Sequence, residues 1–213
     1  MAEIRWFGHN CFRIRGKEAV VMTDPVGKNT GYSMTRQTAD IVTMSHDHPG
    51  HTNLNSIKPE FKVIQGPGEY EMNEVFVTGI RTYHDSKKGS ERGYNTAYVI
   101  ELEGMRFAHL GDLGHTLTEA QAEEFNNVDV LMVPVGGGTT ITAELAADLV
   151  SRLGPKSVIP MQYQTAMGDS ALASAEAFTK LLGIAVPEPV EKLVLKPSDL
   201  TDTTQIFMLT PDK

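Results

Sequence analysis

The segment His46-Asp47-His48-Pro49-Gly50-His51 constrains the fold more than any other part of this 213-residue chain. It directly follows the apolar run at 41–44, which is typical of a short buried strand. Side chains at i and i+2 of an extended segment point the same way, so His46 and His48 are expected to face one side. Pro49-Gly50 can then turn His51 back toward the same point. Imidazoles gathered in this way predict a metal site; the alternative is a histidine-rich surface loop.

Charge and cysteine content exclude several classes of protein. The net charge of −8 gives no basic surface, which argues against broad binding to nucleic acid. A small nucleotide or phosphoester substrate stays open, because a metal ion would supply the positive charge. Cys11 is the single cysteine, so an internal disulfide is excluded. The chain has neither a signal peptide at its start nor an apolar run of the roughly 18 residues that a membrane span needs, and we expect a cytoplasmic protein.

The expected elements place strands first and helices later. We expect strands at 4–14, 19–23, 41–44, 62–65, 73–83, 96–102, 106–110, 128–135, 157–161, 191–195 and 205–209. Helices are expected after Thr118, which opens a capping box with Gln121, after Thr142, and after Asp169 or Ser170. With no internal repeat and no linker, the chain is expected to form a single domain over residues 1–213. Two sheets with helices outside them is the simplest layered arrangement for this order.

Further candidate ligands lie where other expected strands end. His84 follows 73–83, Asp112 follows 106–110 within the stretch HLGDLGH, and Asp24 ends 19–23. Loops at strand ends are where a rigid scaffold commonly presents functional side chains. Taken singly, His84 has the plainer interpretation of a surface residue, and the two aspartates that of turn formers.

Taken together, these segments resemble the metallo-β-lactamase superfamily. The order HDHPGH after a strand, then His84-Asp85, then GDLGH matches that superfamily, whose first motif is His-x-His-x-Asp-His. WFGHN near the start, TDP at 23–25 and HLGD at 109–112 are similar to the branch of ascorbate-6-phosphate lactonase-like hydrolases. The resemblance covers nearly the whole chain. It implies a four-layer αββα sandwich with the metal site at one edge of the sheets.

The resemblance also implies a set of ligands and two gaps. His46, His48 and His84 match the histidines of a first metal site, Asp112 matches a bridging aspartate, and His51 matches a ligand of a second site. The remaining ligands of that second site fall on Gly50, which has no side chain, and on Gln162, whose amide is a poor ligand for zinc. We therefore expect one zinc ion rather than two, with manganese or iron as substitutes.

The function implied by this pattern is metal-dependent hydrolysis of an ester, lactone or phosphoester in a small metabolite. Asp112, His51 and His9 are the expected catalytic residues, and Asp24 is expected to orient a ligand histidine. The basic residues at 87–92 would favour an anionic substrate, and the resemblance leaves a homo-oligomer open. The alternative is a catalytically degenerate protein of the same fold that acts as a binding or scaffolding module.

Overall fold

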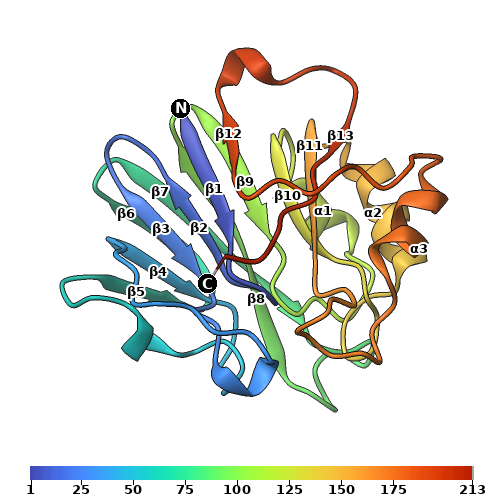
Figure 1. The fold of residues 1–213 in the computed structure, drawn as a ribbon, viewed down its shortest axis with the longest axis horizontal. Helices are drawn as coiled ribbons and strands as arrows, with labels where there is room; N and C mark the ends of the chain where they lie inside the picture. The colour runs from blue at the N-terminus through green and yellow to red at the C-terminus, as the bar shows by residue number, and fades with distance from the viewer. Residues whose placement is uncertain (213) are drawn as a thin grey trace.

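Two β-sheets that face each other form the centre of the structure (Figure 1). The structure is a computed structural model and describes residues 1–212. The first sheet has the order β12-β1-β2-β3-β4-β5. Its strands are β12 (Leu193–Leu195), β1 (Ala2–Trp6), β2 (Phe12–Arg15), β3 (Val20–Thr23), β4 (Ile41–Met44) and β5 (Lys62–Gln65). The second sheet has the order β13-β11-β10-β9-β8-β7-β6. Its strands are β13 (Gln205–Ile206), β11 (Ser157–Met161), β10 (Val130–Pro134), β9 (Met105–His109), β8 (Tyr94–Leu102), β7 (Val75–Tyr83) and β6 (Gly68–Met72).

Apolar residues on both faces of the first sheet explain why it is covered on both sides. Val21 and Ile41 belong to the main core between the sheets. Their neighbours Met22 and Val42 belong to a smaller core on the opposite face, because successive side chains of a strand alternate. Loops and the short 3-10 helices η1 (Lys28–Thr30) and η2 (Leu54–Ser56) lie on that side. A third 3-10 helix, η3 (Pro197–Asp199), follows β12.

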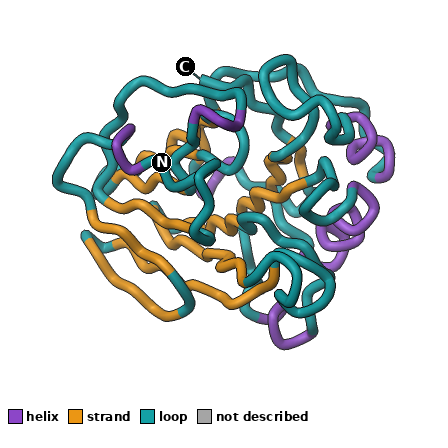
Figure 2. Tube along the Cα trace, turned by 90° about the horizontal axis from the view of Figure 1, so that it is seen from below, coloured by secondary structure: helices purple, strands orange, loops and turns teal. Residues whose placement is uncertain are grey.

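Three α-helices accompany the second sheet, at the right of the view in Figure 2. They are α1 (Glu119–Glu123), α2 (Ala143–Leu153) and α3 (Ala175–Leu181). The capping box of Thr118 and Gln121 opens α1 as predicted, and the Thr142 side chain caps α2. Both α2 and α3 pack their buried faces on the main core. The predicted sandwich is confirmed. Among the described residues, no helix is both long and apolar enough to cross a membrane.

Three of the sequence-based predictions of strands and helices are wrong. Residues 4–14 are not one strand, because Gly8 takes a φ of 92° and the chain reverses there before β2 pairs antiparallel with β1. The helix expected from Asp169 or Ser170 begins only at Ala175, since residues 164–174 form an irregular segment. The strand β6 was missed because it directly follows the turn-forming residues Gly66 and Pro67 and itself begins with Gly68.

Strand direction brings the expected ligands to one edge of the sandwich. β3 and β4 run parallel, and so do β9, β10 and β11. β7 and β9 both pair antiparallel with β8, so they too run in the same direction as each other. The carboxyl ends of these strands lead into the residues named above: Asp24 after β3, His46 after β4, His84 after β7, Asp112 after β9 and Gln162 after β11.

Candidate metal centre

One oxygen of Asp112 is the point at which the candidate ligands meet. The Oδ2 atom lies 3.2 Å from Nε2 of His84, 3.7 Å from Nε2 of His51 and 3.8 Å from Nε2 of His46. Two groups of ligand atoms share this carboxylate, and within each group all atoms lie within 4.8 Å of one another. The first group is His46, His84 and Asp112; the second is His9, His51 and Asp112. Of the four residues predicted for the first metal site, His46, His84 and Asp112 lie together here, and His48 does not.

The imidazoles of His9, His46 and His51 have lowered pKa values and are short of hydrogen-bond partners. Burial lowers the pKa of His46 to about 4, although the charge of Asp112 opposes the shift. Burial likewise lowers the pKa of His51 well below its ordinary value and also lowers that of His9. Nε2 of His46, both ring nitrogens of His51 and Nδ1 of His9 are buried without a hydrogen-bond partner. Unpaired buried polar atoms are costly, and neutral imidazole nitrogens are the ligands that zinc takes. The donor set fits a divalent metal ion.

Asp112 itself stays ionised. Burial acts to raise its pKa, but the hydrogen bond with His84 and the nearby rings of His51, His9 and His46 hold the pKa well below the ordinary value. A carboxylate that is ionised at neutral pH can bind a cation through the oxygen that faces the histidines.

The other oxygen of Asp112 is held by two amides. Asn10 and Gln162 each donate a side-chain hydrogen bond to Oδ1, and Gln162 also donates to the Asn10 side chain. Asn95 accepts from the Asp112 backbone N–H at 2.9 Å. These contacts fix the carboxylate so that Oδ2 is left for the histidines. The sequence interpretation missed Asn10, although it is the last residue of the WFGHN stretch that carried the resemblance.

The ring of His48, a predicted ligand, lies next to Gly50 and outside both groups of ligand atoms. The His48 side chain is exposed and is absent from both ligand groups. Its Nδ1 accepts a hydrogen bond of 3.0 Å from the Gly50 backbone N–H. A Cβ atom at Gly50 would lie 2.9 Å from the same Nδ1, so any side chain there would displace the ring. His48 thus stands beside the centre, with its ring 5.8 Å from that of His46.

Asp24 holds the segment that begins with Ser45 and His46 through hydrogen bonds. Its carboxylate accepts hydrogen bonds of 2.7 Å from both the backbone N–H and the hydroxyl of Ser45, which precedes His46. Its Oδ2 lies 3.9 Å from Nδ1 of His51. Burial raises the pKa of Asp24 to about 8, against the effect of the two bonds from Ser45. This is the place that the sequence predicts for an orienting carboxylate.

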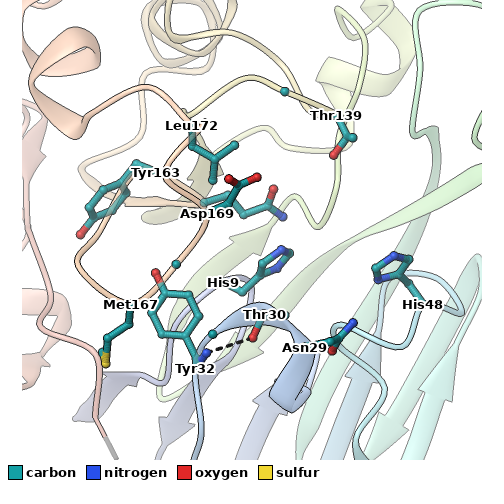
Figure 3. Close-up of a pocket in the computed structure, with 14 residues that line it drawn as sticks. His9, Asn29, Thr30, Tyr32, His48, Thr139, Tyr163, Met167, Asp169 and Leu172 are labelled. Atoms are coloured by element: carbon teal, nitrogen blue, oxygen red, sulfur yellow. Dashed lines mark hydrogen bonds between the residues drawn. The ribbon is translucent and has the colours of Figure 1, made fainter.

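A cavity of about 460 Å³ opens beside the centre (Figure 3). His9 projects into it between Tyr32 and His48, as Figure 3 shows, and Gln162 also lines it. The lining includes Asp169, together with Thr139 from the glycine-rich loop before α2, and contains no lysine or arginine among the described residues. Of the residues in the two ligand groups, His9 contributes to the described lining of this cavity.

Comparison with known proteins agrees with this architecture. The family described as "Beta-lactamase superfamily domain" matches residues 3–162. A candidate Zn-dependent hydrolase of the metallo-β-lactamase superfamily from Thermotoga maritima has a crystal structure that is similar with a TM-score of 0.80, at 36% identity over 99% of this chain and 100% of that one. A UPF0173 protein from Pyrococcus furiosus is 30% identical over 84% of this chain and 90% of its own length. A UPF0173 metal-dependent hydrolase from Pyrococcus abyssi is 25% identical over 93% of this chain and 98% of its own.

The fold and the histidine-carboxylate centre define a protein of the metallo-β-lactamase type. Since the family match spans most of the chain, this protein belongs to the β-lactamase superfamily and, within it, to the UPF0173 family.

Proposed function

We propose that this protein is a metal-dependent hydrolase that cleaves an ester, lactone or phosphoester bond of a small metabolite, with zinc as the metal. The observation that carries the proposal is the group of His46, His84 and Asp112, whose ligand atoms lie within 4.8 Å of one another around buried, unpaired ring nitrogens. His48 completes this group when its exposed ring turns away from Gly50. The names of the relatives support the same activity.

A bound divalent ion supplies two things to such a reaction: it lowers the pKa of a water molecule and it polarises the substrate oxygen. The chain provides the rest. Asn10 and Gln162 hold the carboxylate of Asp112 in place, and Asp24 orients the segment of His46 and His51. His9 and His51 form a second pair at the same carboxylate, and in this proposal they assist the departure of the leaving group.

The cavity indicates how the substrate is held. Because its described lining carries Asp169 and no cationic side chain, an anionic substrate would place its charge at the metal and a neutral part along Tyr32 and Tyr163. The basic residues at 87–92 belong to a loop wound around Asp85, which accepts hydrogen bonds from four backbone N–H groups, and none of them lines the cavity.

The test is metal analysis combined with an activity panel. Full-length protein purified without added metal is expected to carry zinc and to hydrolyse a member of a panel of esters, lactones and phosphodiesters. His46→Asn and His84→Asn should lose the metal and reduce turnover by at least about 100-fold, since even partners of ligands are worth 10- to 100-fold. His115→Asn makes the same chemical change outside both ligand groups and should alter neither.

A binding or scaffolding protein without turnover is the second candidate. The amide of Gln162, which occupies a predicted ligand position and donates to Asp112 instead, favours it. Folded protein that holds no metal after zinc is supplied, and hydrolyses nothing in the panel, would establish this candidate and refute the first.

A further inference from the structure

His9 lies on a turn whose geometry is fixed from several sides. Its backbone has a φ of 50°, in the left-handed region that is unfavourable for a non-glycine residue. The turn is closed by the hydrogen bonds Phe7 N–H to Cys11 O at 2.8 Å and Cys11 N–H to Gly8 O at 2.9 Å. The Trp6 indole donates to the His9 carbonyl at 2.9 Å. The backbone of His9 is therefore fixed by contacts that do not involve its imidazole.

Gly8 allows this turn to lie close to the cavity wall. A Cβ atom at Gly8 would lie 2.2 Å from the ring of Tyr32, so only glycine fits there. The close approach places His9 at the cavity and beside His51.

His9 and His51 face each other as a pair of ligands would. Their rings are stacked with centroids 5.2 Å apart and planes inclined by 23°. Nδ1 of His9 and both ring nitrogens of His51 are buried with no hydrogen-bond partner, and His51 is 0% exposed. Each ring offers a ligand atom within 4.8 Å of the other and of a carboxylate oxygen of Asp112. Leaving these three buried nitrogens unpaired is unfavourable, and a bound cation would give them a partner.

We propose that His9, His51 and Asp112 form a second divalent-cation site, in which His9 replaces the ligands that are missing at positions 50 and 162. The inference rests on the proposed function and extends it: the pair assists the leaving group by holding a cation. Two imidazoles and a carboxylate make a three-ligand zinc site with an open position for substrate. Asp24, 3.9 Å from Nδ1 of His51, orients that ring from behind.

Gln162 acts as a hydrogen-bond donor in this arrangement and not as a metal ligand. Its amide N–H groups point at Asn10 and at Oδ1 of Asp112, so it donates where a ligand would have to offer a lone pair. By occupying Oδ1 together with Asn10, it leaves Oδ2 as the atom that both ligand groups share.

The experiment counts bound zinc in His9→Asn. Asparagine tolerates a positive φ, and the bond from Trp6 reaches the backbone carbonyl, so this change removes the imidazole and keeps the turn. Metal-stripped, full-length protein is titrated with zinc chloride in a calorimeter, and bound zinc is counted by mass spectrometry after desalting. Far-UV circular dichroism of the metal-free proteins verifies that each variant is folded. His115→Asn is the matched control.

The expected result is two zinc ions in the parent protein and in His115→Asn, one for each ligand group, and one in His9→Asn. Replacing zinc by cobalt should give the same counts and a change in the visible absorption of the His9→Asn complex. If the parent binds a single ion, and His9→Asn binds it equally well while His84→Asn loses it, the second site is refuted and the proposed hydrolase stands. If the parent binds no zinc, both proposals fail together.

Discussion

Acid should destabilise the metal-free protein through His109, the last residue of β9. This side chain is 0% exposed, and its Nε2 lies 2.9 Å from the carbonyl oxygen of Asn10, to which the neutral ring donates. Its ring edge meets Phe12, and its Nδ1 has no partner. Burial lowers the pKa from 6.5 to about 4, despite the favourable contact with Asn10. The imidazole is thus neutral in the folded protein over a range in which the unfolded chain already binds a proton.

The direction and size of the effect follow from this difference. Above pH 6.5 both states carry a neutral ring, and the group gives no pH dependence. As the pH falls from 6.5 toward 4, the unfolded state is protonated first, so the free energy of unfolding decreases. At about 1.4 kcal/mol for each pH unit, the loss from this one residue amounts to about 3 kcal/mol. That is a large part of the roughly 5–15 kcal/mol that stabilises a typical domain.

The perturbation is His109→Gln, which keeps a side-chain N–H for the Asn10 carbonyl and removes the titrating ring. Urea unfolding of metal-free protein, followed by circular dichroism between neutral pH and pH 4, measures the free energy at each pH. The variant should lose about 3 kcal/mol less than the parent over this interval, because His46 and the other buried histidines titrate in both proteins. Parallel curves for the two proteins would show that burial does not set the pKa of His109 and would refute the reasoning.

Three further changes test the centre and its surroundings. Gly50→Asp with Gln162→His should restore a second zinc ion in the His9→Asn background. A new Cβ at position 50 would lie 2.9 Å from Nδ1 of His48, and the exposed His48 ring can move away from it. Bound zinc is counted as above, and an unchanged count would contradict the assignment of the two gaps. Gln162→Leu removes two hydrogen bonds from the buried pair of Asn10 and Asp112 and should lower the metal-free stability by about 1–3 kcal/mol in urea unfolding, whereas an unchanged midpoint would mean that water replaces the amide. Asp85→Ala removes the acceptor of four backbone N–H groups, so hydrogen exchange in the peptide 85–93 should accelerate without change in the core strands, and equal protection would refute the role given to Asp85.

The sequence alone determined the class of fold and three of the candidate ligands. Apolar runs followed directly by His46, His84 and Asp112 put these residues after strands, and strand direction then carries them to one edge. The helix starts at Thr118 and Thr142 could also be predicted from the sequence, since capping depends on residues within one turn of each other. These features follow from local chemistry and from the periodicity of strands.

Only the tertiary structure decided which side chains face the centre. Residues 4–14 have the apolar pattern of one strand, yet the chain reverses at Gly8, which has a φ of 92°. The ring of Tyr32, from a distant loop, leaves no room for a side chain at this position. That reversal turns His9 from an expected strand residue into a neighbour of His51, and brings Asn10 to Asp112. His48 lies outside both groups because it bonds to the Gly50 backbone. Spacing along a chain fixes where a residue is presented, but the orientation of its side chain depends on contacts with segments that are remote in sequence.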